Sequence, residues 1–235
     1  MSDLVIHDPV DGVVLVEIDL PPDNLYTLEV CRQLTEVLEQ PPQGAHILRL
    51  RAAGDAFCLG RERGGTTPAE VRTEAEVLVA LMRALRRTRL VTVAEVQGDA
   101  AGFGVGIAAA CDVTVALESA RFSFPEVGIG LAPALVLAWL PRVVGPREAF
   151  WLTATGETIT AARAVELGLV NATAASVEEL GKQSDERAAA LGRRSPRVHA
   201  DIKDMIRMFA EVGDDAALDV SLDRLVVGSL RRGEG

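Results

Sequence analysis

Residues 90–110 read LVTVAEVQGDAAGFGVGIAAA, and this stretch decides how the whole chain is interpreted. Its first part, residues 90–96, is apolar and rich in β-branched residues, which predicts a strand. An alanine-rich helix then follows four glycines: Gly98, Gly102, Gly104 and Gly106. The first N–H groups of a helix have no acceptor within it, so they can stabilise negative charge that develops on an oxygen. The same glycines are equally consistent with tight packing of the helix against the strand, and their spacing is not the G-x-G-x-x-G pattern of dinucleotide-binding folds.

Strands and helices are predicted to alternate on both sides of this stretch. Thr27 is predicted as the N-cap of a helix that extends to about Glu39, and Gly44 and its neighbours end it. Further strands are predicted at residues 13–20, 46–50 and 112–116, and a further helix at residues 69–87. This order predicts an α/β fold class with crossover connections between the strands.

After about residue 145 the signals become helical. Helices are predicted at residues 147–153, 161–167, 177–191, 196–212 and 215–230. We therefore divide the chain into an α/β core, residues 1–145, and a helical C-terminal region, residues 146–235. The sequence shows no internal repeat. The last helix carries several apolar residues, Leu218, Val220, Leu222, Leu225, Val226 and Val227, and this predicts that the C-terminal region takes part in oligomerisation.

Composition narrows the classes of partner. The chain has 235 residues and a net charge of −10, so nucleic acid and anionic membrane surfaces are poor partners for it. No apolar run reaches the roughly 18–20 residues of a membrane-spanning helix. The two longest uncharged stretches, residues 100–111 and 127–141, are interpreted as buried core segments. Three isolated cysteines do not have metal-ligand spacing, and the N-terminus has no secretory signal pattern, so no metal site and a cytoplasmic location are expected.

Two further segments carry candidate chemistry. Residues 55–61 (DAFCLGR) form a turn that follows a predicted strand, and residues 122–131 (FSFPEVGIGL) contain one carboxylate, Glu126. A carboxylate in apolar surroundings can act as an acid or base near neutral pH. The alternative interpretation of Glu126 is a solvent-exposed glutamate at the start of a loop.

At these residues the chain resembles the crotonase (enoyl-CoA hydratase/isomerase) superfamily. The resemblance runs from Val13 to about Gly235 and depends on an ordered set of motifs at spacing similar to that of the family. These are residues 22–25 (PDNL), 56–60 (AFCLG), 98–112 (GDAAGFGVGIAAACD), 120–126 (ARFSFPE), 130–133 (GLAP), 152–153 (LT) with Gly156, and 161–170 (AARAVELGLV). The resemblance implies a core spiral of repeated ββα units that is followed by C-terminal helices, and a homo-trimer or hexamer.

The resemblance also implies a mechanism. The backbone N–H groups of Arg61 and Phe103 would bind the thioester oxygen of the substrate, and Glu126 would transfer the proton. CoA or phosphopantetheine would enter as part of the substrate, with no other cofactor and no metal. The implied substrate-binding positions are Phe57, Cys58, Leu59, Gly60, Gly102, Gly104, Gly106 and Pro133. Phe103 stands where the family has glycine, so its ring is expected to crowd the pocket.

Departures from the family pattern decide which reaction is expected. Gly106 stands where hydratases with two glutamates carry the first one, so the chain resembles the single-glutamate subgroup. The leading expectation is an enoyl-CoA hydratase or dehydratase that uses Glu126. The alternatives are a double-bond isomerase that uses the same glutamate, or another enzyme of crotonase-type enolate chemistry, and a non-catalytic helper subunit. Family members continue beyond this chain with a last helix that covers the CoA adenine, so an acyl-carrier-protein substrate is a further expectation.

Overall fold

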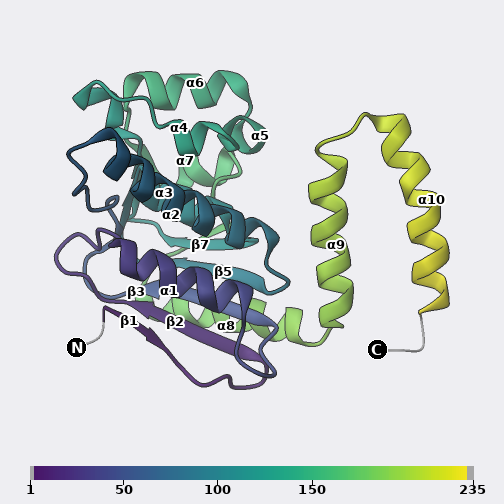
Figure 1. The fold of residues 1–235 in the computed structure, drawn as a ribbon. Helices are drawn as coiled ribbons and strands as arrows, with labels where there is room; N and C mark the ends of the chain where they lie inside the picture. Colours follow the sequence, from purple (N-terminus) through teal and green to yellow (C-terminus); the bar gives the residue numbers. More distant parts are fainter. Residues whose placement is uncertain (1–2, 232–235) are drawn as a thin grey trace.

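A computed structural model describes residues 3–231, and its largest element is a six-stranded sheet (Figure 1). The strand order is β1-β2-β3-β5-β7-β10. The strands span Leu4–Ile6, Val13–Ile18, Ile47–Ala52, Val91–Val96, Val113–Leu117 and Ala172–Ala174. All neighbours are parallel except β1, which pairs antiparallel with β2. The predicted α/β class with crossover connections is confirmed.

A second, smaller sheet accompanies the first. Its order is β4-β6-β8-β9, and the strands span Ala56–Cys58, Asp99–Ala101, Arg121–Ser123 and Ile159–Thr160. Each turn of the chain contributes one strand to each sheet and then a helix: β3, β4 and α2 (Pro68–Arg87), then β5, β6 and α3 (Phe103–Ala110), then β7, β8 and the 3₁₀ helix η1 (Pro125–Ile129). This is the expected ββα spiral, although the repeat is structural and is not visible in the sequence.

Helices cover both faces of the large sheet. In Figure 1, α1 (Leu28–Glu39), α2 and α3 lie over one face, and α8 (Val177–Gly192) lies against the other. The helix α1 begins as predicted, because the Thr27 side chain accepts a hydrogen bond from the N–H of Val30. Its apolar side buries Leu34 and Leu38 in the main core, which consists mostly of aliphatic side chains. Burial of such surface is the main source of stability for a core of this kind.

Three predictions about individual segments need correction. Residues 127–141 are not a uniformly buried segment: Ile129 in η1 is 65% exposed, and only the later part, from Val136 in α4 (Ala134–Leu137) to Leu140 at the start of α5 (Leu140–Val144), enters the core. Residues 99–101, for which the sequence predicts no strand, form β6, because they pair with strands on both sides. The predicted helical region after residue 145 also supplies β9 and β10.

The remaining helices form the C-terminal part. They are α6 (Pro146–Thr155), α7 (Ala161–Glu166), α8, α9 (Pro196–Phe209) and α10 (Asp214–Leu230). Figure 1 shows α9 and α10 beside the sheets, with α10 farther from them than α9. Lys203 of α9 donates to the carbonyl of Leu90 and to Asp112, at 2.6 Å each. Apolar side chains of α10, including Leu218 and Leu222, are exposed, which is consistent with the predicted subunit contact. Among the described helices, none is both long and apolar enough to cross a membrane.

Candidate active site

Two of the glycines in residues 98–106 allow close packing of backbones. A Cβ atom on Gly98 would lie 1.9 Å from the carbonyl oxygen of Asp55, and one on Gly104 would lie 2.0 Å from the carbonyl oxygen of Cys58. No side chain fits at such distances. The segment around β4 and the start of α3 therefore pack closely against each other. At Gly98 and Gly104, the glycines serve the tight packing that was one of the two interpretations of the sequence. That packing brings two of the candidate segments into contact.

The third candidate segment meets them at Gly102. This residue has φ +50° and comes directly before the first residue of α3, Phe103. A Cβ atom on Gly102 would lie 2.4 Å from Oε1 of Glu126, so the glutamate carboxylate occupies the space beside the glycine. No residue in the described range 3–231 accepts a hydrogen bond from the N–H of Phe103. A free N–H group and a carboxylate therefore lie next to each other at the start of α3.

The N–H of Arg61 is also free, and the cause is its pairing with Tyr26. The N–H of Tyr26 donates to the carbonyl of Gly60 at 3.1 Å, and the carbonyl of Tyr26 accepts from the N–H of Glu62 at 3.0 Å. In such a parallel bridge, Tyr26 bonds to the residues before and after Arg61, and the N–H and C=O of Arg61 itself point to the other side. The N–H of Arg61 therefore points away from Tyr26, and it finds no acceptor among the described residues.

Glu126 lies in the first turn of η1 and is partly exposed. Its Oε2 atom is buried and makes no hydrogen bond within the described part of the chain. A buried polar atom without a partner is unusual in a native protein, and such atoms are frequent at functional sites. The interpretation of Glu126 as a fully solvent-exposed glutamate does not fit this burial.

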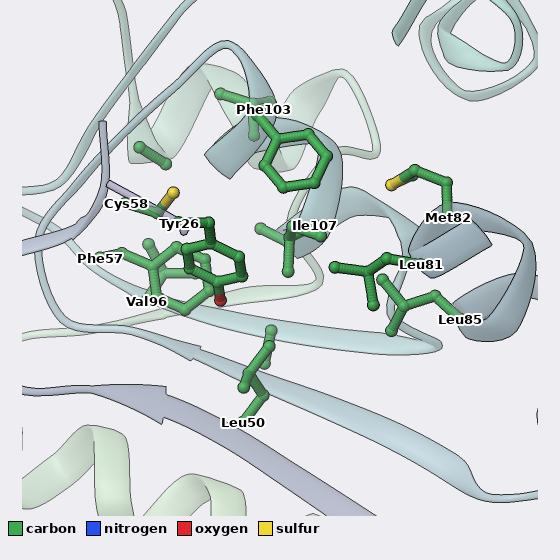
Figure 2. Close-up of a cluster of buried hydrophobic side chains, with 14 of the residues drawn as sticks. Tyr26, Leu50, Phe57, Cys58, Leu81, Met82, Leu85, Val96, Phe103 and Ile107 are labelled. Carbon is green, nitrogen blue, oxygen red and sulfur yellow. The ribbon is translucent and has the colours of Figure 1, made fainter. Parts of the chain in front are cut away.

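The aromatic side chain next to the free N–H points into the core. Figure 2 shows the ring of Phe103 near Tyr26 and Ile107, and the two aromatic rings meet edge to face with centroids 5.8 Å apart. The Phe103 side chain is only 6% exposed. The expectation that this ring crowds the substrate pocket is therefore wrong. The sequence could not reveal its direction, which depends on the start of α3.

The turn after β4 offers less side-chain surface than the sequence suggested. Phe57 and Cys58 are fully buried, and Figure 2 shows both in the core beside Tyr26. Burial raises the pKa of the Cys58 thiol to about 12, and the protonated thiol donates a hydrogen bond to the carbonyl of Gly60. Of these neighbours, Leu59 is exposed, while Gly60 (φ +139°) presents only backbone. A ligand along this turn would touch main chain and Leu59.

Gly106 lies one helical turn after Gly102. A Cβ atom there would meet Val136 at 3.5 Å and Trp139 at 3.9 Å, both ordinary contacts. The neighbourhood of this position is therefore apolar, and it contains the buried indole N–H of Trp139, which makes no hydrogen bond in the described structure. Pro133 is buried and precedes α4, which contains Val136.

One residue that the sequence analysis missed is Glu74 of α2. Its carboxylate accepts hydrogen bonds from the loop that follows Arg61, at Gly64 and Gly65. The only signal in the sequence is an acidic residue about ten positions after a glycine-rich segment, and this arrangement is too common to indicate a contact. Two surface hollows of about 500 and 270 Å³ lie elsewhere, along α1 and beside α9, and none of their lining residues belongs to the candidate site.

Comparison with known proteins identifies the family. Residues 9–225 match the family described as enoyl-CoA hydratase/isomerase. The chain belongs to the enoyl-CoA hydratase/isomerase family. It is therefore a member of an enzyme family, and the resemblance to the crotonase superfamily is confirmed.

Individual relatives support the same assignment. A probable enoyl-CoA hydratase of Bacillus subtilis is 26% identical over 201 residues, which are 83% of this chain and 78% of the relative. Enoyl-CoA hydratase domain-containing protein 2 of mouse mitochondria is 35% identical over 175 residues, which are 72% of this chain and 58% of the relative. The chain thus spans less than two thirds of the mouse protein.

Solved structures show the same fold. An enoyl-CoA hydratase of Bacillus anthracis superposes with a TM-score of 0.87 at 25% identity, over 94% of this chain and 89% of that one. An enoyl-CoA hydratase of Mycobacterium smegmatis gives a TM-score of 0.91 at 22% identity, over 99% and 93%. The second likeness concerns the fold alone.

Proposed function

We propose that this protein adds water to the double bond of an enoyl-CoA thioester, or removes it in the reverse direction. The backbone N–H groups of Arg61 and Phe103 bind the thioester oxygen, and Glu126 transfers the proton. CoA is part of the substrate, so the reaction needs no separate cofactor. The observation that carries this proposal is the carboxylate of Glu126 against Gly102, directly before a helix start whose first N–H group is free.

The chemistry follows from these positions. The oxygen of a water molecule adds to C3 of the enoyl group, and the C2=C3 electron pair moves toward the thioester oxygen to give an enolate. Two N–H groups about 2.7–3.1 Å from that oxygen stabilise its charge. Glu126 accepts the proton that the water loses and delivers a proton to C2, which restores the carbonyl. The sum is the addition of one water molecule.

An isomerase is the second candidate, and Gly106 favours it. The residue has no side chain, and Val136 and Trp139 are its neighbours, so no second carboxylate holds water at this point of the helix. Moving a double bond requires only one group that removes a proton from one carbon and returns it to another. The same Glu126 and the same enolate would serve that reaction.

The test is the variant Glu126→Gln, with Glu118→Gln as a matched control. Glu118 is an exposed acid in the turn between β7 and β8. We expect Glu126→Gln to lower kcat by roughly 10²–10⁴-fold, the usual range for loss of general acid–base catalysis, while the control keeps the wild-type rate. Incubation with 2-enoyl and 3-enoyl thioesters, followed by product analysis, separates hydration from isomerisation. A rate that Glu126→Gln leaves unchanged would refute the proposal and favour a helper subunit.

The proposal extends to assembly and location. The exposed apolar side chains of α10, such as Leu218 and Leu222, support a contact between subunits, and the family resemblance favours a homo-trimer or hexamer. Light scattering at micromolar concentration should then give a mass well above the 25.0 kDa of one chain. We place the enzyme in the cytoplasm, which suits the three cysteines that stay free in the described residues. Comparing one acyl group on CoA, on pantetheine and on an acyl carrier protein identifies the carrier.

A further inference from the structure

A buried carboxylate holds the loop that carries one of the two free N–H groups. Glu74 lies in the second turn of α2 and is 9% exposed. It accepts hydrogen bonds from the N–H of Gly64 at 3.0 Å, from the N–H of Gly65, and from the Arg61 side chain, whose Nη1 atom lies 3.2 Å away. One carboxylate therefore contacts three residues of the segment that follows β4.

This segment would otherwise have considerable freedom. Residues 61–65 contain two adjacent glycines and belong to no helix or strand apart from the single bridge at Arg61. Glycine loses more conformational entropy on ordering than any other residue, so such a loop needs specific partners to remain in one conformation. The loop also lies very close to α2, because a Cβ atom on Gly65 would be 2.9 Å from the backbone nitrogen of Val71.

The position of Arg61 is fixed from both sides. Before and after it, Gly60 and Glu62 are bonded to Tyr26, which holds this point of the chain beside α1. Beyond it, Glu74 binds the Arg61 guanidinium and the next part of the loop. We infer that Glu74 is a positioning residue that fixes the backbone N–H of Arg61 for binding the thioester oxygen. This inference rests on the proposed function, because it gives Glu74 a role only if that N–H contacts the substrate.

The protonation state of Glu74 suits this role. Burial alone would raise the pKa of its carboxyl group, but the hydrogen bonds from Gly64, Gly65 and Arg61 outweigh burial and lower the pKa below its usual value. The group is therefore an anion at neutral pH, and an anion accepts stronger hydrogen bonds than a neutral group does. Glu70, one turn earlier in α2, holds the next loop residues, Thr66 and Thr67, in a capping box.

Kinetics of three variants test the inference. Glu74→Ala removes the acceptor, Glu74→Gln keeps the volume and one acceptor oxygen but loses the charge, and Glu76→Gln is the matched control. Glu76 lies on the same helix and, among the residues that the structure describes, pairs only with Arg72 at the surface. Because a misplacement of about 1 Å can cost roughly 100-fold in rate, we expect Glu74→Ala to lower kcat by about 10- to 100-fold. Glu74→Gln should lie between Glu74→Ala and wild type.

A spectroscopic measurement separates positioning from general loosening. The thioester carbonyl of crotonyl-CoA, labelled with ¹³C, is observed by infrared difference spectroscopy while it is bound to Glu126→Gln protein, which turns over slowly. Two N–H donors weaken the C=O bond and lower its stretching frequency. We expect Glu74→Ala in the same background to shift the bound band back toward the frequency of the free thioester. A merely structural role would reduce the amount of bound thioester without moving its band.

The two proposals fail in different ways. If Glu126→Gln keeps full activity, or if the bound carbonyl shows no shift with Glu74 intact, then the proposed function is wrong. If Glu126→Gln is impaired and the bound band is shifted, but Glu74→Ala and Glu74→Gln keep wild-type kcat and the same band, then the role of Glu74 is overturned and the function stands. Should Glu74→Ala not fold, Glu74→Gln gives the decisive comparison, because it retains the side-chain volume.

Discussion

Replacing Gly102 by alanine should lower the catalytic rate strongly while the protein still folds. The added Cβ would lie 2.4 Å from Oε1 of Glu126, whereas ordinary contact begins at 3.4 Å, so the carboxylate has to move by about 1 Å. The carboxylate is the far end of a flexible side chain and can move without disturbing the backbone. The residue also has φ +50° and ψ −108°, a backbone conformation that L-residues rarely adopt and that costs them about 1–3 kcal/mol.

These two magnitudes predict a folded but impaired protein. A loss of about 1–3 kcal/mol lowers Tm by roughly 2–12 °C in a domain of this size. A misplacement of about 1 Å in a catalytic group lowers kcat by roughly 100-fold. Thermal unfolding by circular dichroism measures the first effect, and the steady-state rate of hydration or isomerisation measures the second.

Neighbouring glycines in α3 provide the controls. Gly106→Ala places its Cβ at 3.5 Å and 3.9 Å from its nearest side-chain neighbours, so it should gain about 0.5–1 kcal/mol of stability, as alanine does in a helix interior. Gly104→Ala places its Cβ 2.0 Å from the backbone of Cys58 and should prevent stable folding. If Gly102→Ala has the kcat and the Tm of wild type, the position of Glu126 beside Gly102 is wrong.

Three further outcomes follow from buried polar contacts. Asn24→Ala removes three hydrogen bonds of 2.7 Å from a buried side chain, so urea unfolding should show a loss of about 3 kcal/mol. Hydrogen bonds from Thr66 and Thr67 lower the pKa of Glu70 to about 2 from 4.5. The ionised carboxylate therefore stabilises the fold fully above pH 4.5, and this stabilisation is lost as pH falls toward 2. The Tm difference between wild type and Glu70→Gln should shrink over that interval. Glu95→Ala leaves the Arg49 guanidinium without its buried partner at 2.6 Å and should cost about 3 kcal/mol, whereas the double variant Arg49→Met/Glu95→Leu should be closer to wild type in chemical denaturation.

The long elements could be predicted from the sequence because each one carries its own signal. The helix α2 was predicted at residues 69–87 and spans Pro68–Arg87, since apolar residues recur at helical spacing over five turns. The strands β4, β6 and β8 have three residues each, too few to show a period. They are strands only because chain segments more than 20 residues apart pair with one another, as Ala56 does with Asp99. Pairing over that distance leaves no local pattern.

The candidate site also combines features that the sequence reveals with features that it does not reveal. The motif around Glu126 could be found in the sequence, because the family pattern preserves its spacing from the glycine-rich turn. The direction of the Phe103 ring and the contact between Glu74 and the loop could not be found in this way. The ring direction and the Glu74 contact depend on how α2 and α3 pack against the rest of the protein. The sequence does not show which residues of these helices meet which neighbours.

Hydrogen-bond partners distinguish Glu126 from other poorly exposed carboxylates in the described structure. Glu95 binds Arg49, and Glu74 binds loop N–H groups. Each of these carboxylates accepts hydrogen bonds from donors within the protein, so its position and its charge stabilise the fold. Glu126 keeps one buried oxygen without a donor, although an unpaired buried acceptor costs about 1–3 kcal/mol. A folded chain keeps such a cost where a ligand supplies the missing partner, and in the proposed hydration the attacking water would donate its proton to that oxygen.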